Sequence, residues 1–450
     1  MTKLDLKLDK NKFKNFCNKI LQDLETDEKL TMTLNAESTQ FTRFNQSKVR
    51  QSTNLTQAFI EFNFIKENKT LNFNLPYLGE EQDLTITKKF LAESRTWFKD
   101  LPEDPFIVYP SFTTSSIEES LNDSNCHLNI TEQIINNTKD LDLNGSLCVG
   151  EVVRATANSA MQFHWFKTQN FYLDYSLYKN EKAIKALYAE AIWNEDNWLK
   201  NLNESKFQLS LMNTPPIKIK KGKYRVYFAP AAVSELLTFL SWGGFSMGDH
   251  QKGSGAFKDL WKGSKKLSPM ITLTEDFSLG LVPRFNQKGE ISPTKIPLIE
   301  NGLLKNFLIS SRTGAEYKTN FNMDVNFASD EEGMRSPNLK TGNLKQENIL
   351  KELNTGLYIS NLHYLNWSDQ ENARVTGMTR YACFWVENGK IVAPIEDLRF
   401  DESYYSFLGD ELIAITDYSE IVPQTGSYSE RELGGAKVPG ILVSKFEFTL

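Results

Sequence analysis

Apolar positions in the first half of the chain follow two spacings, and each spacing predicts a different element. Three- and four-residue spacing predicts an amphipathic helix over residues 9–24, where the apolar positions are Phe13, Phe16, Cys17, Ile20 and Leu21. Strict alternation over 57–65 predicts a half-buried strand. Other elements expected in this half are a strand over 30–34, helices over 84–98, 129–139 and 181–202, and two or three antiparallel strands over 147–178.

The second half has fewer helix signals and many short runs of β-type residues. The turns between these runs include Asn301-Gly302 and Asn388-Gly389, and Asn-Gly is the strongest short signal for a hairpin. Between the halves, two adjacent prolines precede a Lys-rich segment that is typical of an exposed linker. We therefore expect an α+β protein with two domains. A mixed helix and strand domain covers 1–205, a linker covers 206–222, and a predominantly antiparallel β domain covers 223–450.

Charge and hydropathy restrict the possible partners. The 450 residues include 51 Lys and Arg against 57 Asp and Glu, a net charge of −6, and no block of basic residues stands out. The chain therefore lacks the electrostatic footprint of a nucleic-acid-binding protein. The apolar stretch 227–245 is interrupted by Pro230 and Glu235, so we expect a half-buried helix there and no membrane partner.

The four cysteines lie far apart and form no Cys-x-x-Cys pair: Cys17, Cys126, Cys148 and Cys383. Reduced thiols are the simplest interpretation, and Cys148 and Cys383 lie in apolar contexts typical of inert buried thiols. The first residues alternate charged and apolar side chains and lack the apolar run of a signal peptide. A cytoplasmic location is therefore expected.

Histidine spacing argues against a zinc-protease motif. The chain has four histidines, His127, His164, His250 and His363, and no two are close enough to share one helix face. A helical zinc motif needs two imidazoles on neighbouring turns. We therefore expect no catalytic residues and no metal or other cofactor in this chain. A zinc site assembled from distant His and Cys residues is the remaining alternative.

A glycine-rich segment is the strongest candidate for a functional loop. Residues 248–253 match half of a phosphate-binding loop, but Ser254 and Gly255 stand where its Lys and Ser/Thr would be, so that function is rejected. We expect a mobile loop over a cleft, with the candidate residues Gly244, Gly248, His250, Gly253 and Gly255. The acidic run Asp330-Glu331-Glu332 is interpreted as a solvated face.

Five segments of the second half, in order, resemble the TldD/TldE family, also called PmbA or "modulator of DNA gyrase" proteins. They are RVYFAPAAVSELLTFL at 225–240, SGAFKDLWKGSKKLSPMITLTEDF at 254–277, IPLIENGLLKNFLISSRTGAE at 296–316, SPNLKTGN at 336–343 and VTGMTRYACFWVENGKIVAPIEDLRF at 375–400. In the first half only FTRFNQSKVRQST at 41–53 and GEVVRATANSA at 150–160 are similar.

The catalytic branch of that family carries HExxxH in the helix that opens its C-terminal domain, and a cysteine near the C-terminus completes the zinc site. Thr238, Phe239 and Gly243 stand approximately at the motif positions here, and the tail has no cysteine. The helix should bury Val233, Leu236, Leu237 and Leu240 and expose Ser234, Thr238 and Ser241. The resemblance implies the non-catalytic TldE/PmbA-like branch.

That branch implies a partner subunit of a zinc metalloprotease that acts on unfolded peptides. The expected partners are a TldD-like chain, which would hold the zinc, or a second copy of this chain, together with an extended peptide. Two other classes stay open: a stand-alone homodimeric peptide-binding or scaffold protein, and a divergent hydrolase with an unrecognised site. The gyrase name has no support in the charge pattern.

Overall fold

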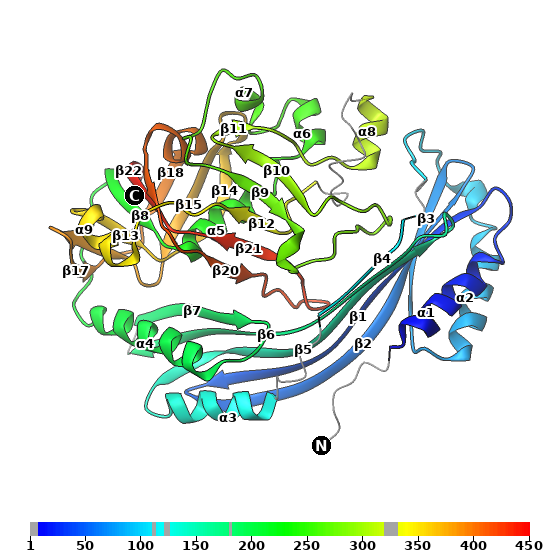
Figure 1. The fold of residues 1–450 in the computed structure, drawn as a ribbon, viewed down its shortest axis with the longest axis horizontal. Coiled ribbons are helices and arrows are strands. Elements are labelled where there is room, and N and C mark those ends of the chain that lie inside the picture. The colour runs from blue at the N-terminus through cyan, green and yellow to red at the C-terminus, as the bar shows by residue number, and fades with distance from the viewer. Residues whose placement is uncertain (1–7, 110–113, 121–126, 180–181, 319–331) are drawn as a thin grey trace.

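The computed structural model describes residues 8–109, 114–120, 127–179, 182–318 and 332–450. Figure 1 shows the first half as one long twisted sheet, with the strand-rich second half packed against one side of it. The sheet order is β3-β2-β1-β5-β6-β4, and β7 also pairs with β6. Its strands are β1 (Lys29–Asn45), β2 (Lys48–Lys66), β3 (Lys69–Pro76), β4 (Ser116–Ser120), β5 (Asp142–Asn158), β6 (Phe163–Lys179) and β7 (Lys182–Glu190).

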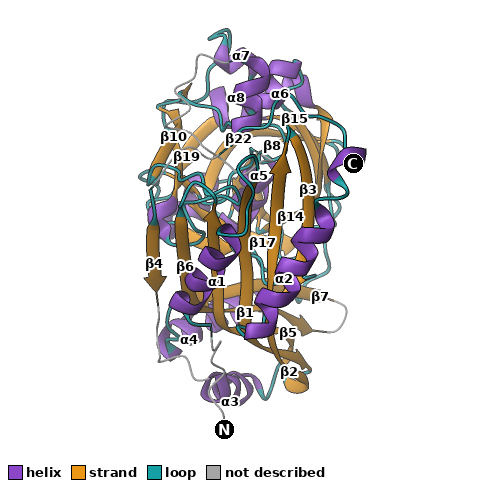
Figure 2. Cartoon of the chain, turned by 90° about the vertical axis from the view of Figure 1, so that its right-hand side faces the viewer, coloured by secondary structure: helices purple, strands orange, loops and turns teal. Residues whose placement is uncertain are grey.

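Helices pack against the sheet through apolar side chains. They are α1 (Lys10–Leu21), α2 (Glu81–Ser94), α3 (His127–Thr138) and α4 (Glu195–Leu211). Figure 2 shows α1 and α2 lying across the strands. Four of the five apolar positions predicted for the first helix are buried, and they pack on alternate residues of β1: Leu30, Met32, Leu34 and Ala36. Helices α3 and α4 pack in a second apolar cluster, which also contains Ala382 and Phe384 of the second half.

The other face of β1 is polar and buried beneath the second half of the chain. Thr31, Thr33, Asn35 and Glu37 are all less than one-tenth exposed. A carboxylate removed from water must fill its acceptor sites with hydrogen bonds. The Glu37 carboxylate accepts from the backbone N–H of Arg431 at 3.1 Å. Arg431 belongs to residues 425–432, which we call the tail segment.

The predicted helix over 181–202 is wrong. Strand β7 occupies its first part, and α4 begins after a break at which the Asn194 side chain caps the backbone N–H of Asn197. Ile184 and Tyr188 are buried, and their four-residue spacing fits one face of a strand as well as one face of a helix. Pairing with β6 decides between the two. Helix α4 then continues to Leu211, so the first six residues of the expected linker are helical.

The second half contains two sheets. The six-stranded sheet has the order β11-β10-β9-β12-β21-β20. Its strands are β9 (Leu273–Asp276), β10 (Lys295–Glu300), β11 (Leu303–Leu304), β12 (Pro337–Leu339), β20 (Glu420–Pro423) and β21 (Gly435–Val438). The nine-stranded sheet has the order β14-β15-β18-β22-β8-β13-β16-β17, with β19 on β22. Its strands are β8 (Gly222–Phe228), β13 (Gly356–Ile359), β14 (Asn361–Asp369), β15 (Arg374–Arg380), β16 (Phe384–Glu387), β17 (Lys390–Pro394), β18 (Arg399–Ser403), β19 (Leu412–Ile415) and β22 (Ile441–Phe448).

Antiparallel pairing dominates this half, as predicted. Among the named strand pairs of the described second half, only β8 with β13 and β12 with β21 are parallel. The Asn-Gly pairs at 301–302 and 388–389 join β10 to β11 and β16 to β17. Both residues of each pair have positive φ, as a tight hairpin turn requires. The predicted α+β class, with a strand-rich second half, is confirmed.

Helix α5 (Pro230–Phe239) packs between these two sheets, against β14 and β21. Its predicted stripe of Val233, Leu236, Leu237 and Leu240 is buried in the main apolar cluster of this half. Ser234, expected on the outer face, is buried instead. Within the described ranges, no helix combines the length and apolar character needed to cross a membrane.

Candidate functional site around helix α5

The three positions that the sequence places approximately at the zinc motif, Thr238, Phe239 and Gly243, lie in the last turn of α5 and just beyond it. Thr238 is half-buried, whereas Phe239 is only 6% exposed. The Phe239 ring packs against Trp367 and Trp242, with centroid distances of 4.8 and 5.8 Å. Gly243 follows the helix with φ +89°. These positions therefore present a hydroxyl, a buried aromatic ring and a glycine, and none of the three provides a strong zinc ligand.

The conformation at Gly243 restricts what could replace it. A Cβ atom built there would lie 2.2 Å from Nε2 of Gln370 and 3.1 Å from a carboxylate oxygen of Asp249. Positive φ also disfavours a residue with a side chain. An imidazole at this position would therefore need both a displaced Gln370 and a strained backbone.

The glycine-rich segment folds into short packed helices. Ser246 caps α6 (Met247–Lys252), and Gly253 ends it with φ +83°. A Cβ on Gly244 would lie 2.5 Å from the Leu240 carbonyl oxygen, and one on Gly255 would lie 2.9 Å from the His250 Cα. These glycines allow close backbone packing. The expected motion over a cleft stays a prediction.

Glu332 joins this segment to a second helix. It is 3% exposed, so its interpretation as part of a solvated face is wrong; Asp330 and Glu331 lie outside the described residues. One oxygen accepts from Ser246 Oγ at 2.8 Å and from the Gly248 N–H at 2.7 Å. The other accepts at 2.6 Å from the N–H of Ser310, which caps α8 (Ser311–Tyr317). A carboxylate is well placed at two helix N-termini, where unpaired N–H groups point outward.

Burial lowers the pKa of the three histidines whose side chains are described, His164, His250 and His363. His250 stacks on Phe307 at 4.7 Å, and burial, helped by Lys262, lowers its pKa. Burial also lowers the pKa of His164 to about 4, and its Nδ1 lies 2.9 Å from Ser116 Oγ. For His363, burial and the neighbouring Arg380 lower the pKa. Side-chain surroundings of His127 lie outside the described residues.

Cys17, Cys148 and Cys383 are free and buried, and burial raises the pKa of each thiol. The value is about 11 for both Cys148 and Cys383. Thiols with raised pKa are poor nucleophiles and poor metal ligands. Cys126 lies outside the described residues. In the part of the chain that the structure describes, no group of three His, Cys, Asp or Glu side chains could hold a metal ion.

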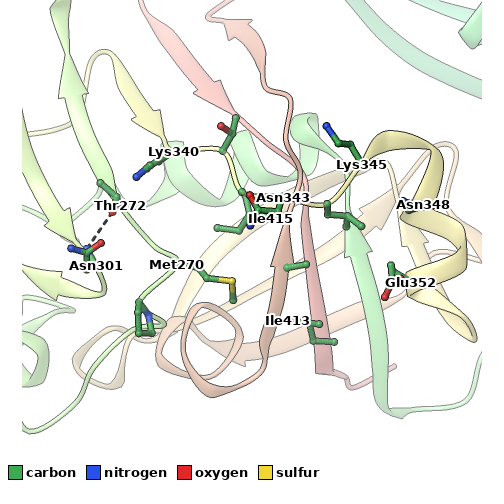
Figure 3. Close-up of a pocket in the computed structure, with 15 residues that line it drawn as sticks. Met270, Thr272, Asn301, Lys340, Asn343, Lys345, Asn348, Glu352, Ile413 and Ile415 are labelled. Carbon is green, nitrogen blue, oxygen red and sulfur yellow. Dashed lines mark hydrogen bonds between the residues drawn. The ribbon is translucent and has the colours of Figure 1, made fainter.

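A cleft with a volume of about 600 Å³ lies on the second half, and Figure 3 shows the side chains that line it. Its lining includes the apolar side chains of Met270, Ile413 and Ile415 and the lysines Lys340 and Lys345. Lys345 pairs with Asp417 at 2.5 Å. Apolar and polar side chains are therefore mixed along this cleft, as they are in many ligand-binding sites.

A second concavity, which we call the junction cavity, lies between the two halves. It has a volume of about 340 Å³ and is lined by β4, β6 and β7 of the long sheet. The second half contributes residues 279–281, 421, 423–424 and 431–434. The buried Arg431 of the tail segment lines it. No sequence pattern predicts this cavity, because its walls come from segments far apart in the chain.

The fold and the residues around α5 match one class of protein. A family model for the PmbA/TldA metallopeptidase C-terminal domain matches residues 221–450. Since this match covers more than half of the chain, the chain belongs to the TldD/TldE (PmbA) family, and the resemblance seen in the sequence is confirmed. No curated protein sequence matches the chain.

Solved structures share the whole fold at low sequence identity. One is described as a modulator of DNA gyrase from Thermotoga maritima: it has 14% identity and a TM-score of 0.75, with 97% of this chain and 100% of that one covered. Another is TldE from Thermococcus kodakarensis, with 14% identity, a TM-score of 0.74, and 98% and 100% coverage. The shared architecture therefore includes the long N-terminal sheet that the family model does not cover.

A buried carboxylate gives one testable pH effect. Burial raises the pKa of Glu275 to about 7, although it accepts from the backbone N–H groups of Arg335 and Ser336 at 2.7 and 2.9 Å. Because the native state then binds this proton more tightly than the unfolded chain does, the contribution to stability is present below about pH 4.5 and is lost as pH rises through about 7. We expect Glu275→Gln to weaken the fall in the free energy of unfolding between these pH values, measured by urea denaturation.

The exposed Glu347→Gln is the matched control and should leave the pH dependence as in the wild type. Identical slopes for the wild type and Glu275→Gln would contradict this account of the buried carboxyl.

Proposed function

We propose that this chain is the non-catalytic, TldE/PmbA-like subunit of a cytoplasmic TldD/TldE-type zinc metalloprotease that acts on unfolded peptides. The observation that carries the proposal is the set of residues at the end of α5, which includes no strong zinc ligand. The positions that we align approximately with the family's motif are Thr238, a Phe239 in contact with two tryptophans, and a Gly243 with positive φ. Zinc and the activated water would come from a TldD-like partner.

Packing around α5 supports a role without metal chemistry. A zinc ligand set needs its imidazoles oriented by further hydrogen bonds, and losing those partners costs about 10–100-fold in affinity or activity. Here the same space is filled by aromatic rings, and Nε1 of Trp367 donates to the Trp242 carbonyl at 2.6 Å. The helix end is therefore built as an apolar support.

Free strand edges support a role in holding extended peptide. Strand β20 ends the six-stranded sheet, and its outer edge has no partner strand among the described residues. Such an edge binds an extended chain by main-chain hydrogen bonds, which needs little sequence specificity. A subunit that offers this edge beside a partner's zinc would present unfolded peptide for cleavage.

Exposed aromatic side chains support assembly with another chain. Trp242 at the end of α5 and Tyr364 on β14 are 70% and 75% exposed. Aromatic residues are enriched at the centres of protein interfaces. We expect a dimer that buries more than about 1,000 Å² in total, formed with a TldD-like chain when one is present and with a second copy otherwise.

Co-expression with the TldD-like chain of the same host tests the proposal. We expect a heterodimer by light scattering, and cleavage of an unfolded protein such as reduced casein that stops when a chelator is added. Substituting the first histidine of the partner's HExxxH should abolish cleavage but leave the complex intact. If this chain captures no such partner, or cleaves casein by itself, the subunit function is withdrawn.

Restoring the motif should not restore activity. We expect the triple variant Thr238→His, Phe239→Glu, Gly243→His to lack peptidase activity and to unfold at a lower temperature than the wild type. The Glu would be buried without a partner among aromatic rings, and the second His would strain the backbone. Zinc-dependent casein cleavage by this variant would contradict the account.

Thr238→His alone is the matched control, because this position is half-exposed on a regular helix. We expect its midpoint of thermal unfolding to stay close to that of the wild type.

A further inference from the structure

The cleft of Figure 3 adjoins a second concavity on the same half of the chain. The two have volumes of about 600 and 320 Å³, and Thr272, Lys340 and Thr341 line both of them. We call the two concavities together the lysine groove. Its walls come from the six-stranded sheet, from β19 of the nine-stranded sheet and from the segment that joins them, so the groove spans both sheets of the second half.

The smaller concavity lies over one face of the six-stranded sheet. Thr274 of β9 is paired with Asn338 of β12, which is paired in turn with Lys437 of β21. Lys340 directly follows β12, and its N–H continues the ladder by donating to the Thr272 carbonyl at 3.0 Å. Side chains at paired positions, and at positions two apart along a strand, point to the same face of a sheet. Lys340 and Lys437 therefore share this face, and both line the smaller concavity.

Positive charge predominates along the lysine groove, although the whole chain has a net charge of −6. The charged residues that line it are four lysines and two carboxylates: Lys295, Lys340, Lys345, Lys437, Asp276 and Glu352. Lys295 pairs with Asp276 at 3.2 Å, and Lys345 pairs with Asp417 at 2.5 Å. Lys340 and Lys437 have no ion pair among the described residues, so their charges are available to an anion.

The carboxylate of Asp276 does not cancel these two charges. It is 2% exposed, and it accepts from Asn338 Nδ2 at 3.1 Å as well as from Lys295. Burial opposes ionisation here, but hydrogen bonds from Ser278, Asn338 and Lys295 outweigh it and lower the pKa of Asp276. Its charge is therefore balanced by its own partners. Hydroxyl groups also line the same end of the groove, and they belong to Thr274, Thr341 and Ser419.

The larger cleft provides the apolar part of the groove and the remaining carboxylate. Met270 and Ile413 line this cleft and not the smaller concavity, and the same is true of Glu352. Met270 is 41% exposed, and a flexible methionine side chain adapts to different apolar partners. An anionic side chain is therefore expected at the end with Lys340 and Lys437, and an apolar side chain in the larger cleft.

A carboxylate on a peptide suits this groove better than a polyanion does. Nucleic acid is held by many phosphate contacts, whereas only two lysines of the groove lack an ion pair among the described residues. The smaller concavity also lies beside the edge strand β20, because Ser419 directly precedes β20 and Lys437 is paired with Ile421 of that strand. A peptide on the free edge of β20 therefore has this end of the groove beside it.

We propose that the lysine groove binds an acidic segment of an extended peptide, with side-chain carboxylates on Lys340 and Lys437 and a neighbouring apolar side chain against Met270 and Ile413. One exposed ion pair contributes little, so the preference depends on both lysines and on the hydroxyl donors beside them. This inference rests on the peptide-handling function proposed above and names the kind of peptide segment that this chain prefers.

Binding of two fluorescein-labelled heptapeptides to the purified full chain tests the proposal by fluorescence anisotropy. They are Ala-Asp-Asp-Leu-Asp-Asp-Ala and its uncharged counterpart Ala-Asn-Asn-Leu-Asn-Asn-Ala, both amidated at the C-terminus. Carboxylates on both sides of the leucine allow either chain direction to bring one pair to the two lysines. We expect the acidic peptide to bind at least about fivefold more tightly at low ionic strength, and this preference to shrink as salt screens the charges.

Variants of the groove separate its charged end from its apolar part. Lys340→Glu combined with Lys437→Glu should abolish the preference for the acidic peptide, whereas Lys340→Arg combined with Lys437→Arg keeps both charges and should retain it. Met270→Ser should weaken binding of both peptides by a similar factor, because it removes apolar surface and leaves the lysines unchanged.

A matched double variant controls for net charge. Lys200→Glu combined with Lys218→Glu changes the net charge by the same amount, at exposed positions outside the lysine groove. It should bind both peptides with the affinities of the wild type. Circular dichroism and thermal midpoints verify that each variant is folded.

Equal affinity for the two peptides in the wild type, or no binding of either, would overturn the proposal. So would an unchanged preference in the folded variant with both groove lysines reversed, or loss of the preference in the net-charge control. Failure of this site is distinguishable from failure of the subunit function, because capture of the TldD-like partner is measured without either peptide. A complex that forms and cleaves casein while the two peptides bind equally would refute the lysine groove alone.

Discussion

The rest of the structure depends on the contacts between the polar face of the long sheet and the tail segment, residues 425–432. Glu37 accepts from the Arg431 N–H at 3.1 Å, and Gln57 donates to the Ser429 carbonyl at 3.0 Å. Arg154 pairs with Glu430 at 3.1 Å. Glu37 and Arg431 are buried, and leaving a buried polar group unsatisfied costs roughly 1–3 kcal/mol. These bonds fix the position of the tail segment and thereby form the junction cavity.

Local sequence patterns were sufficient to predict the apolar faces but not the lengths of the strands. The stripes of α1 and α5 were predicted correctly, because one face of an isolated helix already reveals its core side. Strands β1 and β2 have 17 and 19 residues, much longer than expected. The polar face of β1 is buried by the second half of the chain, and residues 48–54 of β2 are exposed and pair with β1. No local pattern shows either of these long-range contacts. The error at 181–202 has the same origin, since the pairing of β7 with β6 outweighs helix periodicity.

The candidate site, like the fold, could be predicted only in part from the sequence. The sequence was sufficient to predict that Thr238, Phe239 and Gly243 are not strong zinc ligands, because the type of side chain decides this. The role of Glu332 could not be predicted from the sequence. An acidic run in a polar context does not indicate that one of its residues joins two helix N-termini. Arg431 was missed as well. Its surrounding residues Ser429, Glu430 and Glu432 indicate an exposed segment, and only the fold shows that its guanidinium is buried.

We propose that this chain keeps the family's fold without zinc chemistry of its own. The zinc content of the purified chain, measured by mass spectrometry after incubation with Zn²⁺ and gel filtration, tests it most directly. The account predicts well under one zinc per chain and no peptidase activity that a chelator removes. One zinc per chain, bound through His250, His363 or Cys383, would contradict it.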